Sequence, residues 1–237
     1  MNILITGTSR GLGFQTALEL SSREGCQVFA LSRQKEGLDK LLKTALQKHK
    51  GAKIVPLHFD LEHGNFQDLF LEIKKHTSHL DILINNAASI VVKPFMDLTE
   101  DDFSKVYKLN VIRTASLIRL LVPLMERTNG PRAHIVNISS MGGFQGSMKF
   151  AGLSAYSSSK AALAGLTESL AEELKEKHIS ANCLCLGAIQ TEMLNEAFPG
   201  YQAPLTPEEM ALYVADFALN GSKYFNGKIL PVSLSTP

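Results

Sequence analysis

Short apolar runs alternate with longer amphipathic stretches along the whole chain. Buried parallel strands read as near-continuous apolar segments, so the short runs predict seven β-strands. They cover residues 2–6, 26–31, 53–59, 80–85, 133–139, 180–186 and 229–232. The longer stretches repeat apolar side chains at helical spacing. They predict helices over residues 14–24, 37–50, 65–76, 100–127 and 154–177.

This alternation of strand and helix predicts an α/β fold with one parallel, doubly wound sheet. Right-handed crossovers would place helices on both faces of that sheet. No repeat or low-complexity linker divides the 237 residues, so residues 1–237 are predicted to form a single domain. Sheets of this kind bind ligands beyond the carboxyl ends of their strands. Six positions of chemical interest follow strand ends: Gly13, Arg33, Asp60, Asn86, Ser140 and Gly187.

Composition narrows the range of partners and locations. The formal net charge is +1, with 45% hydrophobic and 20% charged residues, which argues against a nucleic-acid or anionic-membrane surface. The longest apolar stretch, residues 111–125, is interrupted by Arg113 and Arg119 and would not span a bilayer. An odd number of cysteines, three, suits a reducing, cytoplasmic compartment. The seven histidines show no metal-ligand spacing, so no metal site is predicted.

A glycine-rich loop follows the first strand. Its sequence, Gly7-Thr8-Ser9-Arg10-Gly11-Leu12-Gly13, leads directly into the first helix. Glycine allows a sharp turn and a close approach of the backbone to a pyrophosphate, whose charge sits at the helix N-terminus. A tight turn without a ligand is the plainer reading. The position after the first strand favours a Rossmann-type dinucleotide-binding loop.

The second strand ends at Ser32-Arg33, about 20 residues past the glycine loop. An acidic residue here would bind the ribose diol of NAD, and the sequence has none. Arg33 and Arg10 would instead suit the 2′-phosphate of NADP, because guanidinium matches phosphate geometry. The alternative is that both arginines are ordinary surface charges. The sequence therefore favours NADP over NAD.

Tyr156 and Lys160 lie four residues apart, about one helical turn, so their side chains share a face of the predicted helix. An ammonium about 5 Å from a phenol would lower the phenol pKa by roughly two units. That shift would suit a general acid or base. The spacing alone is weak evidence, because Tyr224 and Lys228 repeat it across a turn.

Taken together, these motifs resemble the compact branch of the short-chain dehydrogenase/reductases. The resemblance covers nearly the whole chain, in order. Ala88 replaces the usual glycine of the family's Asn-Asn-Ala-Gly motif, and Leu186 replaces the usual proline after the sixth strand. The matching elements are Thr6-Gly7-x-x-x-Gly11-x-Gly13, Asp60, Asn85-Asn86-Ala87, Asn110, Ser140, Tyr156-x-x-x-Lys160 and Gly187-x-x-x-Thr191.

The resemblance implies a role for each of these positions. Tyr156 would be the general acid/base, Lys160 would hold the nicotinamide ribose, Ser140 would orient the substrate oxygen, and Asn110 would bind a water in a proton relay. The implied cofactor-binding residues are Gly7, Ser9, Arg10, Gly11, Leu12, Gly13, Ser32, Arg33, Asp60, Leu61, Asn86, Ala87, Tyr156, Lys160, Gly187, Ile189 and Thr191.

The expected activity is NADP(H)-dependent reduction of a ketone or aldehyde, or oxidation of the corresponding secondary alcohol. An NAD-dependent alcohol dehydrogenase and a non-catalytic NADP-sensing protein are the alternatives. Helix 154–177 is apolar on more than one side, and with the resemblance this predicts a homodimer or homotetramer. A small hydrophobic carbonyl or alcohol substrate is predicted from an apolar wall of Phe144, Met148, Phe150, Met193, Leu194 and Phe198.

Overall fold

The computed structural model describes residues 1–234, and its centre is a seven-stranded parallel sheet. The strand order is β3-β2-β1-β4-β5-β6-β7, which confirms the predicted doubly wound Rossmann fold. The assignment of the full range 1–237 to one domain stays a prediction, and its last three residues lie outside those described. The strands are β1 (Asn2–Thr6), β2 (Gln27–Ser32), β3 (Ile54–His58), β4 (Ile82–Asn85), β5 (Ala133–Ser140), β6 (Ile179–Leu186) and β7 (Ile229–Val232).

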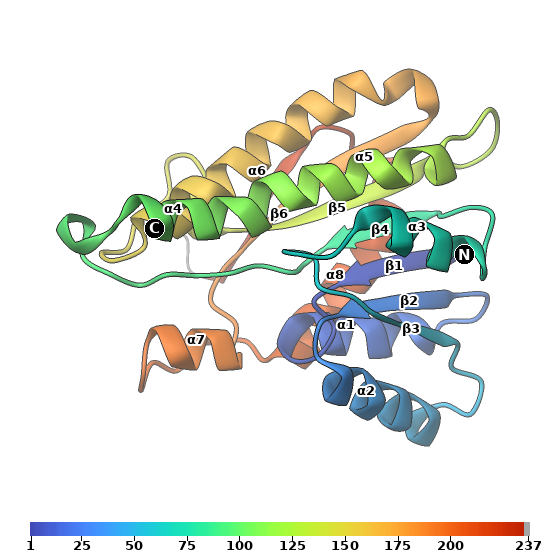
Figure 1. The fold of residues 1–237 in the computed structure, drawn as a ribbon, viewed down its shortest axis with the longest axis horizontal. Coiled ribbons are helices and arrows are strands. Elements are labelled where there is room, and N and C mark those ends of the chain that lie inside the picture. The colour runs from blue at the N-terminus through green and yellow to red at the C-terminus, as the bar shows by residue number, and fades with distance from the viewer. Residues whose placement is uncertain (235–237) are drawn as a thin grey trace.

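Helices cover both faces of this sheet (Figure 1). One face carries α1 (Gly11–Ser21), α2 (Lys35–Lys48) and α8 (Pro207–Asn220), and their apolar sides form one core cluster with the strands. The other face carries α3 (Phe66–Lys74), α4 (Glu100–Tyr107), α5 (Thr114–Met125) and α6 (Ser154–Glu173). Side chains of α3, α5 and α6 form the second core cluster. The short helix α7 (Glu192–Ala197) lies apart from the sheet.

Three helical regions differ from the prediction, and one of them is the short helix α7, which the sequence pattern did not predict. The predicted helix over residues 100–127 is wrong as one continuous α-helix, because a π-helical segment, Lys108–Arg113, separates α4 from α5. Helix α8 was missed, although Thr206 and Glu209 form a capping box before it and Pro207 occupies its first turn. The capping box and a proline in the first turn are both recognised signals of a helix start.

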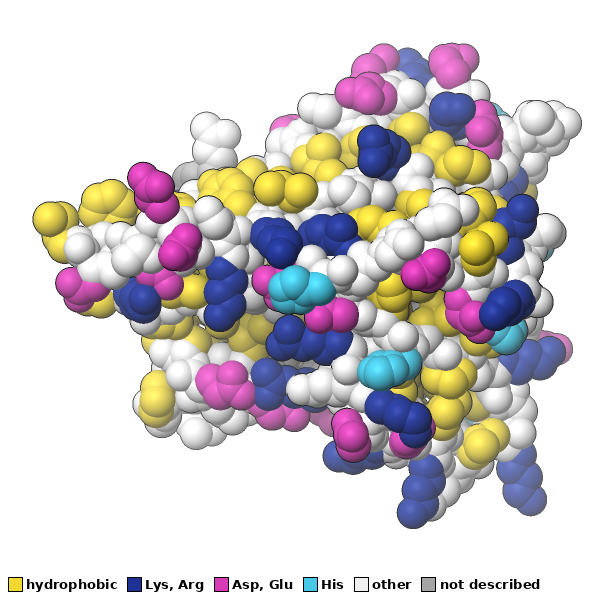
Figure 2. Space-filling model, viewed as in Figure 1, with side chains coloured by type: hydrophobic (Ala, Val, Ile, Leu, Met, Phe, Trp, Pro, Cys, Tyr) yellow, Lys and Arg dark blue, Asp and Glu magenta, His cyan; other side chains and the backbone are white. Residues whose placement is uncertain are grey.

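The surface mixes charges of both signs. Figure 2 shows basic and acidic side chains interspersed on the viewed face rather than separated into fields of one sign. Within residues 1–234, none of the helices is both long and apolar enough to cross a membrane.

The cysteines and a histidine show how the sheet interior tolerates polar atoms. Cys183 and Cys185 are buried in β6, where they act as small apolar residues. On β5, the buried His134 has Nδ1 at 2.9 Å from the Ala218 carbonyl oxygen and Nε2 at 3.0 Å from Nδ2 of Asn182. A neutral imidazole fits both contacts, with Nδ1–H donating and Nε2 accepting. A second ring proton would face the Asn182 amide donor.

Acidification should therefore destabilise the protein through His134. Burial lowers the pKa of His134 to about 4, whereas unfolded histidine titrates near ~6.5. Below pH ~6.5 the unfolded state binds the proton and the folded state does not, so unfolding becomes more favourable down to pH ~4. The expected contribution is about 3 kcal/mol in full, of which about 2 kcal/mol is lost between pH 7 and pH 5. Urea unfolding of wild type and His134→Gln at pH 7 and pH 5 measures it. Equal pH slopes in the two proteins would contradict the assignment.

Candidate active site

The parallel register brings the functional loops to one edge of the sheet. β1 pairs with β4, β4 with β5, and β5 with β6, all parallel, so their carboxyl ends lie side by side. The glycine loop follows β1, Asn86 follows β4, Ser140 ends β5 and Gly187 follows β6. Segments far apart in sequence therefore meet at one place, as the strand pattern predicted.

Tyr156 and Lys160 lie in the first two turns of α6 and face each other. The Lys160 Nζ atom is 5.7 Å from the centroid of the Tyr156 ring. It also donates a hydrogen bond of 2.8 Å to the Ile138 carbonyl oxygen of β5, which fixes the ammonium beside the sheet. Lys160 is 2% exposed, and this burial lowers its pKa to about 8.

The two adjacent serines at the end of β5 do different things. The Ser139 hydroxyl is buried and donates to the Lys160 carbonyl oxygen at 2.9 Å, so it ties α6 to the strand. The Ser140 hydroxyl accepts from the Gly142 N–H at 3.1 Å, and its proximity to the Tyr156 phenol acts to lower the phenol pKa. This arrangement supports Ser140, rather than Ser139, as the residue that orients a substrate oxygen.

The predicted lowering of the Tyr156 pKa by Lys160 is wrong for this structure. Burial raises the pKa of Tyr156 to about 12, and the hydrogen bond from Ser140 offsets only part of that rise. Removing a phenolate from water disfavours the charged form. The ammonium is held by the Ile138 carbonyl oxygen instead. Tyr156 is therefore a neutral phenol near neutral pH, which makes it a proton donor.

Asn110 lies inside the π-helical segment and is 1% exposed, so its side chain faces the protein interior. Its Nδ2 donates to the Ser89 carbonyl oxygen and to the Ser159 hydroxyl, both at 3.0 Å. Its Oδ1 accepts from the Ser89 N–H at 2.8 Å. Ser159 in turn donates to the Tyr156 carbonyl oxygen at 2.7 Å. Both amide hydrogens are thus used within the protein, and the side chain braces the helical turn of Tyr156.

Ser159 was not among the predicted site residues, and only its helical spacing from Tyr156 signals it. π-helical insertions often occur at functional sites. The proton relay through Asn110 stays a prediction.

The glycine loop is shaped for a close approach to a ligand. Gly7 and Gly11 have φ of +74° and +56°, in the left-handed region that glycine adopts without strain. A Cβ atom on Gly13 would lie 2.2 Å from the Gly7 carbonyl oxygen, so only glycine at position 13 allows the loop and α1 to pack this closely. The loop leads straight into the N-terminus of α1, whose first N–H groups have no intrahelical acceptor. This cradle fits a dinucleotide pyrophosphate.

Asn86 and Ala87 are hydrogen-bonded to Thr6 and Gly7 and so hold the start of the glycine loop in place. Asn86 Nδ2 donates to the carbonyl oxygens of Thr6 and Gly7 at 3.0 and 3.2 Å. The N–H groups of Asn86 and Ala87 both donate to the Thr6 hydroxyl at 3.0 Å. The expected contact of Asn86 with the adenosine side stays a prediction. Thr6, whose hydroxyl joins β1 to the loop after β4, is the residue that makes this clasp.

Arg10 and Arg33 are both exposed and each meets a carboxylate. Arg10 Nη1 lies 2.8 Å from Glu196 Oε1 of α7. Arg33 Nη1 lies 4.0 Å from Glu62 Oε2 in the loop after β3. Exposed pairs of this kind contribute about 0–1 kcal/mol, so both guanidinium groups remain available to a phosphate.

The loops after β2 and β3 carry the residues that are predicted to lie at the adenosine end of the cofactor. The Ser32 hydroxyl accepts from the Gln34 N–H at 3.1 Å, which shapes the turn that presents Arg33. Asp60 accepts from the Glu62 N–H at 2.8 Å and lies 3.1 Å from His63. Its pKa is lowered: the His63 and Glu62 hydrogen bonds outweigh the opposing effect of desolvation. Leu61 follows at this edge.

The remaining predicted cofactor residues have mainly backbone roles. Ser9 packs against the start of α2, where a Cβ on Gly37 would lie 2.4 Å from the Ser9 Cβ, and Leu12 is buried in the core. Gly187 leaves no room for a side chain beside Ser233. Ile189 is buried, and the Thr191 hydroxyl caps α7 by accepting from the Leu194 N–H at 3.2 Å.

Comparison with known proteins decides what this arrangement belongs to. Residues 1–202 match the short chain dehydrogenase family. The chain belongs to the short-chain dehydrogenase family. It is therefore an oxidoreductase that acts on CH–OH or carbonyl groups with NAD(P).

Individual short-chain dehydrogenases are similar over almost the full length. The mouse protein named dehydrogenase/reductase SDR family member 4 is 32% identical, over 99% of this chain and 86% of the relative. A Pseudomonas aeruginosa RhlG/NADP active-site complex superposes with a TM-score of 0.84 at 28% identity, covering 98% of this chain and 94% of that one. A short chain dehydrogenase from Escherichia coli CFT073 complexed with NADPH also gives 0.84 at 28% identity, covering 97% and 95%.

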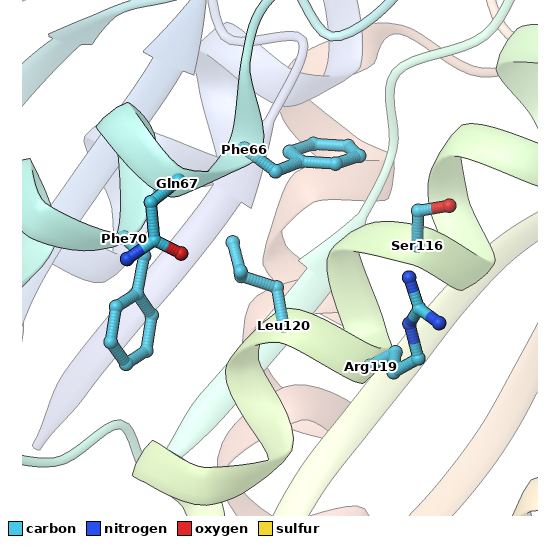
Figure 3. A pocket seen from close by; sticks show the side chains of 6 residues that line it. All are labelled: Phe66, Gln67, Phe70, Ser116, Arg119 and Leu120. Carbon is cyan, nitrogen blue, oxygen red and sulfur yellow. The ribbon is translucent and has the colours of Figure 1, made fainter.

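Two hollows in this short-chain dehydrogenase have linings that do not include Tyr156. One of about 350 Å³ lies between α3 and α5, where Figure 3 shows Phe66, Phe70 and Leu120 with Arg119 at one side. The other, of about 550 Å³, lies between α6 and the loop after Ser140, and it is lined by Phe144 and Phe150 among others. The predicted substrate wall is thus split, because Met193, Leu194 and Phe198 belong to α7 and the residue after it.

Proposed function

We propose that this short-chain dehydrogenase reduces a ketone or aldehyde to an alcohol, with NADPH as the hydride donor and Tyr156 as the proton donor. The observation that carries the proposal is the neutral phenol of Tyr156 on the first turn of α6, beside Ser140 at the end of β5 and at the sheet edge where the glycine loop lies. A phenol with a pKa of about 12 keeps its proton at neutral pH, as the reductive direction requires.

NADPH, when bound, supplies the hydride that reaches the carbonyl carbon. The protein's own contribution is at the oxygen. Tyr156 transfers its hydroxyl proton to the developing alkoxide, and the Ser140 hydroxyl stabilises that negative charge by a hydrogen bond. Lys160, protonated below its pKa of about 8, is proposed to hold the nicotinamide ribose. Asn110 and Ser159 hold the turn of α6 on which the phenol is carried.

NADP is proposed over NAD because of Arg10 and Arg33. Arg10 lies in the glycine loop and Arg33 directly follows β2, where the 2′-phosphate of NADP is proposed to bind. The two similar structures above are also described as complexes with NADP or NADPH. A titration of the purified protein should give tighter binding of NADPH than of NADH. Arg33→Ala should weaken NADPH binding by about tenfold or more and leave NADH binding unchanged, because a charge-assisted contact to the 2′-phosphate is lost.

Arg23→Ala is the matched control for that titration. Arg23 is also exposed and paired with a carboxylate, Glu19, but it lies just past the C-terminal end of α1, whereas the glycine loop leads into the N-terminal end. Equal affinities for NADPH and NADH, or an unaffected Arg33→Ala variant, would contradict NADP specificity.

The substrate is proposed to be a small hydrophobic carbonyl compound, because the predicted substrate wall, which includes Phe144, Phe150, Met193 and Leu194, is apolar. Self-association is proposed as well. Helix α6 exposes Ala161 and Gly165 on the side opposite the sheet, and Leu166 beside them is half-buried. The mass of the protein at micromolar concentration checks this, and a strict monomer would contradict it.

A further inference from the structure

Helix α7 is held to the molecule by few contacts. Each residue in Glu192–Ala197 is at least partly exposed, and the helix stands away from the sheet in Figure 1. The bridge between Ile189 and Leu205 joins the two ends of the segment that contains α7, and the Thr191 side chain caps the start of the helix. Within residues 1–234, its single ion pair is the one between Glu196 and Arg10.

Both ends of α7 meet the glycine loop. At its last turn, Glu196 Oε1 lies 2.8 Å from Arg10 Nη1. At its first turn, a Cβ atom on Gly11 would lie 3.4 Å from Glu192 Oε2 and 3.4 Å from Thr191 Cγ2. The carboxylates of Glu192 and Glu196 on α7 therefore lie on the side of the glycine loop that would receive the anionic part of a dinucleotide.

Arg10 thus has two competing anions. One is the Glu196 carboxylate, which the structure shows, and the other is the 2′-phosphate, which rests on the proposed NADP dependence. A phosphate carries up to two negative charges and three acceptor oxygens, and guanidinium pairs with it more strongly than with a single exposed carboxylate. Glu196 would then face a like charge at close range and be repelled.

We propose that Glu196 competes with the cofactor 2′-phosphate for Arg10, so that NADP binding releases α7 from the glycine loop. Glu196 is in this sense a specificity-determining residue, because it opposes binding of the 2′-phosphate and has no such effect on NAD. Linkage requires the reciprocal effect: docking of α7 weakens NADP binding by the same factor by which NADP weakens docking. Met193 and Leu194 of the predicted substrate wall belong to α7. Binding of the 2′-phosphate at Arg10 therefore also changes the position of part of the substrate wall.

The test uses 2′,5′-ADP, which carries the 2′-phosphate, and 5′-AMP, which lacks it. Amide hydrogen exchange of residues 190–200 should rise when wild-type protein binds 2′,5′-ADP and should not rise with 5′-AMP. Glu196→Gln should show the higher exchange without ligand and no further rise. The same variant should bind 2′,5′-ADP about threefold to fivefold tighter than wild type, with 5′-AMP affinity unchanged.

Glu62→Gln is the control, because it frees Arg33 without touching α7. It should bind 2′,5′-ADP more tightly and retain the wild-type exchange response. If Glu196→Gln binds 2′,5′-ADP like wild type, or if exchange in residues 190–200 ignores the 2′-phosphate, the inference is wrong while NADP dependence stands. If neither 2′,5′-ADP nor NADPH binds to any variant, NADP dependence fails and the inference fails with it.

Discussion

Replacing Tyr156 by Phe should lower turnover by about 10²- to 10⁴-fold, the range of a lost general acid. The substitution removes one oxygen and keeps the ring under the Lys160 Nζ atom, 5.7 Å from its centroid. Because the pKa of the half-buried Tyr156 phenol is raised to about 12, it is the protonated group that the reaction loses. NADPH affinity should stay within about threefold of wild type, since the loss is specific to the transition state.

Tyr224→Phe is the matched control for this experiment. Tyr224 precedes Lys228 at the same spacing, but it is 79% exposed and lies outside α6. Turnover of the control should equal that of wild type. Full activity in Tyr156→Phe would remove Tyr156 from the mechanism, and equal losses in both variants would show that the effect is not specific to the site.

Gly13→Ala should abolish cofactor binding or prevent folding. The added Cβ would lie 2.2 Å from the Gly7 carbonyl oxygen and 2.4 Å from Asn86 Nδ2, and neither group can move without breaking the clasp around Thr6. Overpacking of this kind typically costs about 1–3 kcal/mol, and any relief displaces the loop that would cradle the pyrophosphate. Thermal unfolding together with an NADPH titration measures both consequences.

Gly165→Ala provides the comparison, because nothing lies within 4 Å of a Cβ at that exposed position of α6. It should bind NADPH normally and be neutral or more stable by up to about 1 kcal/mol, since alanine favours helix. A Gly13→Ala protein with wild-type stability and NADPH affinity would contradict the close packing of the glycine loop against α1.

The sequence predicts the scaffold well because its signals are local. β1 and β7 have the predicted bounds, and the other strands differ by a residue or two. The convergence of Ser140, Asn86 and the glycine loop follows from parallel strands whose carboxyl ends share one edge. The start of α8 is also predictable from local sequence, because Thr206 and Glu209 form a capping box there.

Features that depend on three-dimensional surroundings were not predictable from spacing. Tyr156 and Lys160 share a helix face as expected, but burial, which no local pattern encodes, reverses the direction of the Tyr156 pKa shift. The π-helical segment at Asn110 arises where its amide bonds Ser89 and Ser159, residues distant in sequence. The Arg10–Glu196 contact likewise joins residues 186 positions apart.

The most direct measurement of the central claim is hydride transfer itself. The protein would be incubated with NADPH deuterated at the transferable position of the nicotinamide and a panel of apolar ketones and aldehydes, and the alcohols analysed by mass spectrometry. The account predicts an alcohol that carries one deuterium on the former carbonyl carbon, formed by wild type and by Tyr224→Phe and nearly absent with Tyr156→Phe. Tight NADPH binding with no deuterated alcohol from any member of the panel would contradict the proposed reductase activity.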